Sequence, residues 1–193
     1  MGHVLGGVAV AWIADLLPGR PAGRLRLTLT CAGLAALPDI DLLLPIAHRT
    51  VTHSIGAVAV ITIIAAAVTG KVTRKKLQGG RIAGWLDWRI ALTCGAAYAS
   101  HLLLDWLQLD PTPPYGIQAL WPFTSSWYMS GWNVFGPTER RHFLEWAVMR
   151  SNLLTVIREL AILVPVVVAL WLVRVKAAAR FATELSRGDH PTQ

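Results

Sequence analysis

Long apolar runs separated by short polar and basic stretches dominate the chain. Five of them cover residues 1–17, about 25–47, 54–70, 84–108 and 153–175. Each is longer than a typical strand, and none alternates apolar and polar residues, so the pattern predicts helices. A helix needs about 20 apolar residues to cross a bilayer, a length that the second, fourth and fifth runs reach. The first and third lie at the lower limit, and we expect an all-α, multipass membrane bundle of about five helices.

The predicted bundle is a single integral membrane domain over residues 1–193. Residues 109–152 open with three prolines and then carry several aromatic side chains, which is typical of a connection on the membrane surface. Residues 177–193 form a basic tail. The first run lacks the basic n-region of a signal peptide, so we interpret it as a retained helix.

Composition and charge support a membrane protein. Of the 193 residues, 54% are hydrophobic and only 15% are charged, which excludes a disordered chain. The formal net charge is +7, and 12 of the 18 basic residues fall in connections that would share one side of the membrane. They are Arg20, Arg24, Arg26, Lys71, Arg74, Lys75, Lys76, Arg81, Arg174, Lys176, Arg180 and Arg187. The positive-inside rule places that side in the cytoplasm, so the partner of this charge is the lipid bilayer of the cell (inner) membrane, not nucleic acid.

Histidine and aspartate side chains gather in the halves of the runs that this topology places on the non-cytoplasmic side. They are His3, Asp39, Asp41, His48, His53, His101 and Asp105. An ionisable residue at the centre of a membrane helix costs at least about 2.5–3.5 kcal/mol, and is usually paired, hydrated or bound to a cation. Imidazole and carboxylate together are the ligands of zinc, manganese or iron, and we expect a divalent metal, zinc first. Both cysteines lie in apolar runs, which excludes a cysteine-based zinc ribbon.

Other residues indicate where an anionic group would bind. Thr50 and Thr52 offer an N-cap for the third helix, and a helix N-terminus beside a metal favours an anion such as phosphate. Arg49 offers the same anion bidentate hydrogen bonds. Glu159 is an additional candidate for the site, although next to Arg158 it is equally compatible with a local ion pair.

Interpretations in which the same residues bind no metal stay open. Residues 38–41 are compatible with a turn between two shorter helices, and His48 and His53 with interfacial side chains that bind no metal. His101 and Asp105 lie four residues apart on one helix face, where they would also form an intramembrane hydrogen bond. All of these interpretations would have to hold at once in one layer of the membrane, which favours the metal site.

The motifs that carry these residues resemble a known family. In chain order they are Gly2-His3, Leu37-Pro38-Asp39-Ile40-Asp41, His48-Arg49-Thr50-Val51-Thr52-His53-Ser54, Ser100-His101-Leu102-Leu103-Leu104-Asp105, and Gly116 leading to Leu120-Trp121-Pro122-Phe123. Over residues 2–123 they resemble the YdjM family of membrane-bound metal-dependent hydrolases. The resemblance implies that all seven histidines and aspartates above are ligands, and Glu159 resembles a glutamate before that family's last helix. Residues 109–114 depart from the family's polar threonine-glycine turn, so the rim of the site differs.

The leading hypothesis is a membrane hydrolase in which a metal activates water. Asp39 or Asp41 would act as general base and Arg49 would bind an anionic group, with a phospholipid, another phosphoester or a lipid-linked molecule as substrate. A transporter that handles metals, protons or other ions is the first alternative, because intramembrane histidine and aspartate also mark ion pathways. A non-catalytic scaffold is the second. The chain has neither the His-Glu-x-x-His of zinc proteases nor the Gly-x-Ser-x-Gly of serine hydrolases.

Overall fold

The computed structural model describes residues 2–17, 25–43, 48–76, 82–111, 113–139, 142 and 144–188. It contains the α-helices α1 (Gly2–Asp15), α2 (Leu25–Ala36), α3 (Ile55–Lys76), α4 (Ile82–Leu107) and α5 (Trp146–Gly188), and the 3-10 helices η1 (Leu37–Leu43) and η2 (Val51–His53). The described residues form no strand, only two isolated β-bridges within the connection and at its start. The expected all-α class with five main helices is confirmed.

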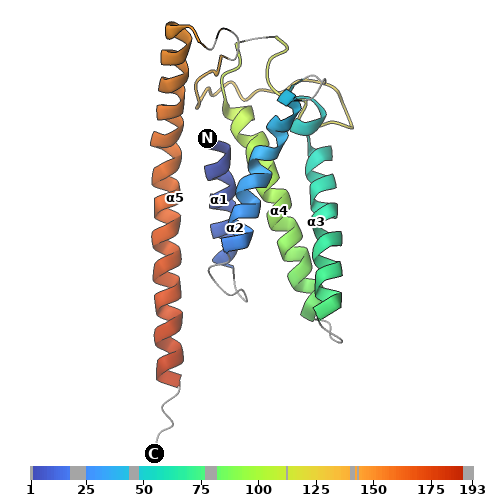
Figure 1. The fold of residues 1–193 in the computed structure, drawn as a ribbon, viewed down its shortest axis with the longest axis vertical. Helices are drawn as coiled ribbons and strands as arrows, with labels where there is room; N and C mark the ends of the chain where they lie inside the picture. The colour runs from blue at the N-terminus through green and yellow to red at the C-terminus, as the bar shows by residue number, and fades with distance from the viewer. Residues whose placement is uncertain are drawn as a thin grey trace, which may run out of the picture.

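Helices α1 to α4 pack side by side, with α4 in contact with the other three (Figure 1). Small residues line the crossings, and Ala11, Cys31 and Ala97 form one buried cluster. Gly7 of α1 lies against the carbonyl of Cys31 in α2, with no room for a Cβ atom. Such close backbone approach is typical of helices that pack within a membrane. Helix α5 stands along the α1 side of this group.

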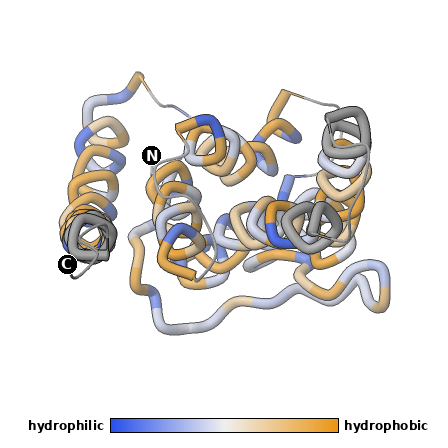
Figure 2. The backbone as a smooth tube through the Cα atoms, turned by 90° about the horizontal axis from the view of Figure 1, so that it is seen from below, coloured by the Kyte–Doolittle hydropathy of each residue, from blue (hydrophilic) through white to orange (hydrophobic). Residues whose placement is uncertain are grey.

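Two stretches of the described chain are long and apolar enough to cross a membrane, Trp88–Leu107 in α4 and Trp146–Arg180 in α5. Helix α1 and residues 55–70 of α3 are apolar but shorter. The 14 residues of α1 rise about 21 Å, less than the roughly 30 Å of a hydrocarbon core. Figure 2 shows apolar residues along the helices, α5 included, and many large apolar side chains of these helices are exposed. The crossing of the membrane by all five helices stays a prediction.

The helices divide the molecule into two ends (Figure 1). The N-termini of α1 and α3 and the C-termini of α2 and α4 share the upper end with the connection. At the opposite end, Asp15 closes α1 and pairs with Arg174 of α5, with 3.1 Å between Oδ2 and Nε. The segments that carry Lys71–Lys76 and Arg26 lie at this lower end too, while Arg20, Arg24 and Arg81 lie outside the described residues.

Two local expectations need correction. The long helix α5 begins at Trp146 and continues to Gly188, so it extends beyond both ends of the apolar run expected at 153–175. The N-cap of α3 is Ser54, because its Oγ accepts the backbone N–H of Ala57 at 3.2 Å. Thr50 makes no capping hydrogen bond, and the hydroxyl of Thr52 donates to Asp41 instead.

Candidate metal centre

Four ligand atoms from three segments, η1, η2 and α4, converge at the upper end of the bundle. The Nε2 atoms of His53 and His101 lie 3.1 Å apart. Oδ2 of Asp105 lies 3.2 Å from the first and 3.5 Å from the second. Oδ1 of Asp39 lies 3.9 and 3.7 Å from the same two nitrogens. A tetrahedral zinc ion with bonds of about 2.0–2.1 Å separates its ligands by about 3.3 Å. The atoms of His53, His101 and Asp105 have this spacing, and Asp39 lies slightly farther out.

Local helix geometry brings these atoms together. His101 and Asp105 are one turn apart on α4, so they present their side chains on the same face. His53 ends η2 just before α3, and Asp39 lies in η1, which continues α2 in the same direction. The 3-10 helix η1 contacts α4, and η2 is joined to the same helix by the hydroxyl of Tyr98, which donates to the carbonyl of Thr52 at 2.6 Å.

Contacts at the Nδ1 atoms orient the rings of His53 and His101. Nδ1 of His101 donates to the carbonyl of Ala35 at 2.7 Å, which leaves Nε2 of the neutral ring available to a metal. Nδ1 of His53 lies 3.2 Å from Oδ2 of Asp41 and 3.0 Å from the hydroxyl of Thr52. Both histidines and Asp105 are almost fully buried. An imidazole held by a carboxylate or a backbone carbonyl is the usual second layer of a metal site.

Asp41 contacts the Nδ1 atoms of His48 and His53. Its Oδ1 accepts from Nδ1 of His48 at 2.6 Å, and its Oδ2 accepts from the hydroxyl of Thr52 at 2.6 Å and the backbone N–H of Arg49 at 3.2 Å. These contacts suit a carboxylate that orients ligand histidines. The expectation that Asp41 itself binds metal stays a prediction.

The ligand atoms fall into two groups of three, each with all atoms within 4.8 Å of one another. The groups are His3, His101 and Asp105, and Asp39, His48 and His53. The rings of His3 and His101 stack, with centroids 3.7 Å apart and planes 19° apart. Every ligand expected from the sequence except Asp41 therefore lies in a group that could hold a metal ion.

The charges at the site are closely coupled. Burial of His53 opposes its protonation, but hydrogen bonds to the carboxylates of Asp105 and Asp41 raise its pKa above the ordinary value. A metal ion must displace the proton from this ring, because only the unprotonated imidazole nitrogen binds metal. Metal binding at His53 therefore weakens as the pH falls.

Arg49 contacts both the centre and the connection between α4 and α5. Its guanidinium donates to Asp110 at 2.7 Å and to Oε1 of Gln108 at 2.6 Å, while Nε lies 3.5 Å from Oδ2 of Asp105. The backbone of Arg49 is left-handed, with φ 63°, and is held there by its N–H bond to Asp41 and by the N–H of Gln118. Here the guanidinium that we expected to bind an anion is paired with carboxylates, so that role stays a prediction.

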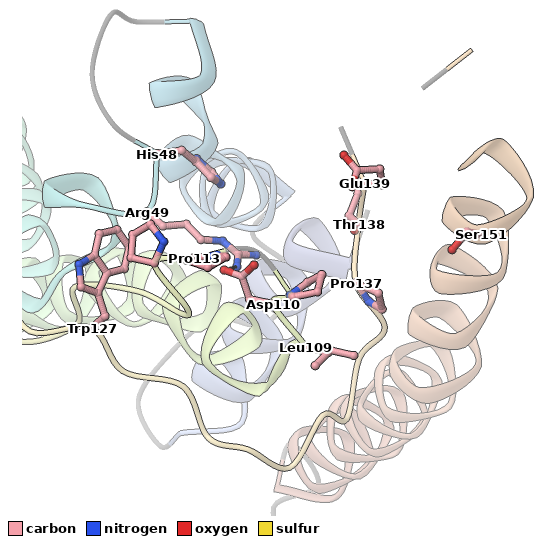
Figure 3. Close-up of a pocket in the computed structure, with 12 residues that line it drawn as sticks. His48, Arg49, Leu109, Asp110, Pro113, Trp127, Pro137, Thr138, Glu139 and Ser151 are labelled. Carbon is pink, nitrogen blue, oxygen red and sulfur yellow. Dashed lines mark hydrogen bonds and ion pairs between the residues drawn. The ribbon is translucent and has the colours of Figure 1, made fainter. Parts of the chain in front are cut away.

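A cavity of about 380 Å³ lies beside the centre, between the connection and the start of α5. His48, Arg49 and Trp127 lie along one side of it, and Glu139 and Ser151 lie on the other (Figure 3). Several prolines of the connection complete its wall. A cavity of this size fits a small-molecule ligand. The four converging ligand residues do not line it, but His48, which contacts Asp41, and Arg49, which lies near Asp105, do.

The sequence did not single out Gln108 and Asp110 as site residues, although both hold Arg49. The only sequence feature that pointed to them was their position shortly after Asp105. Glu159 lies in neither ligand group, and its Oε2 accepts the backbone N–H of Gly2 at 3.0 Å, next to His3. The exposed pair of His142 and Glu145 lies outside the centre.

A comparison with known families identifies the family of the chain. The model of the YdjM inner membrane protein family matches residues 1–181. The chain belongs to this family. The match confirms the resemblance seen in the motifs and extends it into α5, as far as residue 181. The family description places the YdjM proteins in the inner membrane, while the side on which the site lies is not shown. No curated protein and no solved structure matches the chain.

Proposed function

We propose that this YdjM family member is a membrane-bound, metal-dependent hydrolase that acts on a phosphoester or lipid-linked substrate. The observation that carries the proposal is the convergence of His53, His101, Asp105 and Asp39, next to residues His48 and Arg49 that line a cavity. Two imidazole nitrogens and a carboxylate oxygen within 3.5 Å of one another match the three protein ligands of a catalytic metal site. Such sites keep a fourth position open for water or substrate.

Asp39 is the best candidate for the general base. Its side chain is 33% exposed, whereas those of Asp41 and Asp105 are 0% and 3% exposed. Its Oδ1 also lies farther from the histidine nitrogens than Asp105 does, so it borders the open position. A divalent ion held by the other three residues would lower the pKa of a water molecule and polarise a phosphoryl oxygen. Asp39 would then accept a proton from the attacking water.

Arg49 would receive the anionic part of the substrate. Its guanidinium lies between Asp105 at the centre and Asp110 at the cavity. A phosphoryl group entering the cavity would exchange with Asp110 as the partner of this guanidinium, which forms bidentate bonds with either anion. Gln108 holds the guanidinium from the side and would keep it in place during that exchange.

The membrane placement is part of the proposal. We propose that α1 to α4 and α5 together form a multipass bundle whose site opens on the non-cytoplasmic face, with a bilayer lipid as the nearest source of substrate. A transporter would need polar groups through the whole bundle. In the described helices the charged residues lie toward the two ends, and residues 4–14, 27–36, 56–70, 90–100 and 160–173 carry none. This distribution favours the enzyme over the transporter.

The direct test is hydrolysis of 4-nitrophenyl phosphate and bis(4-nitrophenyl) phosphate by the full chain purified in detergent. We expect turnover that a chelator abolishes and an added divalent ion restores. Asp39→Asn should lower kcat by about 10²–10⁴-fold while metal remains bound, because it removes the base and leaves the three ligands. Glu145→Gln is the matched control, since it makes the same change at an exposed carboxylate.

Two results would count against this function. Metal-loaded wild-type protein that turns over neither phosphoester nor a phospholipid in mixed micelles would refute the proposed substrate class. Equal kcat in Asp39→Asn and wild type would remove Asp39 from the mechanism.

A further inference from the structure

His3 is not explained by a site for one ion at His53, His101 and Asp105. It opens α1 and stacks its ring on that of His101. Its Nε2 lies 3.5 Å from Oδ1 of Asp105, the oxygen that does not face the first site. Its Nδ1 is buried and has no hydrogen-bond partner among the described residues. The nitrogen that faces Asp105 is Nε2, so this is the atom of the His3 ring that is placed to bind a cation next to Oδ1.

Asp105 divides its two oxygens between two sets of partners. Oδ2 faces the Nε2 atoms of His53 and His101, at 3.2 and 3.5 Å. Oδ1 faces His3 at 3.5 Å. A carboxylate with one oxygen toward each of two nitrogen sets is placed as a bridge, and metal ions in two-metal hydrolases lie about 3.5–4 Å apart.

A small cavity adjoins His3 on the side of α5. It has a volume of about 10 Å³, and its lining is mixed: His3, Gln108 and Glu159 are polar, and the rest are Gly2, Leu104, Phe135 and Leu163. This volume is close to the minimum that holds one water molecule. The carboxylate of Glu159 is fixed beside it, because Oε2 accepts the N–H of Gly2 at 3.0 Å. The cavity thus provides room and a second anionic group next to His3.

From these contacts we infer that a second divalent ion binds beside the first, held by His3, Glu159 and the Oδ1 atom of Asp105. The inference rests on the metal centre of the proposed function and deepens it. Four carboxylates, those of Asp39, Asp41, Asp105 and Glu159, lie at or beside the centre, and Arg49, which pairs with Asp110, also lies 3.5 Å from Asp105. One divalent ion balances two of these four negative charges, and the remaining excess of negative charge favours a second cation. Paired ions are typical of phosphatases and nucleases, so the second ion favours a phosphoester substrate.

Metal stoichiometry tests the inference without an activity assay. The full chain in detergent is equilibrated with Mn²⁺, freed of excess metal, and analysed by elemental mass spectrometry and electron paramagnetic resonance. Wild type should hold about two ions per chain and show the spectrum of an exchange-coupled pair. His3→Ala and Glu159→Gln should each hold about one ion, with the six-line spectrum of isolated Mn²⁺. His142→Ala, at an exposed histidine, should keep the wild-type ratio.

The outcomes separate the second ion from the proposed function. A single isolated ion in wild type, or a coupled pair in folded His3→Ala and Glu159→Gln, overturns the second site. Hydrolysis by a protein with one ion would overturn the second site and leave the proposed function standing. A coupled pair without phosphoester hydrolysis would support the second site and refute the function. If His3→Ala fails to fold, Glu159→Gln gives the same comparison, because it keeps the shape of the side chain.

Discussion

Purified His53→Ala and His101→Ala proteins should each lose the metal ion of the first site. Each substitution removes one of the two Nε2 atoms that lie 3.1 Å apart at the centre of the ligand set. The remaining nitrogen and the carboxylate of Asp105 leave an ion with only two close protein ligands, fewer than the three of a catalytic site. The measurement is the ratio of metal to protein by elemental mass spectrometry, and hydrolysis should be lost in parallel.

Folding has to be checked beside this loss, because both histidines are completely buried. His101→Gln and His53→Gln keep more of the side-chain volume and should lose metal in the same way. His142→Ala is the matched control, with a side chain that is 73% exposed. Metal at the wild-type ratio in folded His53→Ala and His101→Ala would show that the ion binds elsewhere.

Asp41→Asn should weaken metal binding by about 10–100-fold without removing a ligand of the first site. One oxygen of Asp41 faces Nδ1 of His48 and the other faces Nδ1 of His53. In asparagine one of these oxygens becomes an NH₂ group, which sets a donor against an imidazole N–H. One histidine then loses the acceptor that fixes its orientation and tautomer. The apparent Kd for Zn²⁺ or Mn²⁺, measured by competition with a chromophoric chelator, reports the change.

Glu145→Gln makes the same chemical change at a side chain that is 64% exposed, and its Kd should equal that of wild type. Asp41→Asn with an unchanged Kd would mean that Asp41 does not orient the ligand histidines. Complete loss of metal in a folded Asp41→Asn protein would favour the other possibility, that Asp41 is itself a ligand.

The clustering of many residues of the centre could be predicted, because they lie on or next to helices whose positions follow from the apolar runs. The spacing of His101 and Asp105 fixes both on one face of α4. The alternation of helix direction, inferred from the basic connections, placed His3, Asp39 and His53 at the same end of the bundle, where the structure has them. These inferences need only helix periodicity and the order of the segments.

The different roles of Asp39 and Asp41 could not be predicted. They lie two residues apart in a 3-10 helix, whose tighter turn gives no simple rule for which side chain faces inward. The structure buries Asp41 against His48 and His53 and leaves Asp39 partly exposed. The same limit applies to Thr52, whose hydroxyl bonds Asp41 instead of capping α3.

The contacts that the connection makes could also not be predicted from the sequence. Arg49 pairs with Asp110, and Gln108 holds Arg49, Gly136 and Thr138 together. These bonds join segments that are far apart in the chain and have no regular periodicity. The same connection forms much of the wall of the cavity, so the shape of the proposed substrate site depends on the part of the chain that the pattern described least.

The central claim is that histidine and carboxylate side chains at one end of the bundle hold a divalent metal ion. Metal K-edge X-ray absorption of the protein reconstituted with Zn²⁺ tests it most directly. We expect nitrogen and oxygen ligands at about 2.0–2.2 Å with the outer-shell scattering of imidazole rings, all lost in His53→Ala. Sulfur ligands at about 2.3 Å, no imidazole scattering, or no retained metal would contradict the account.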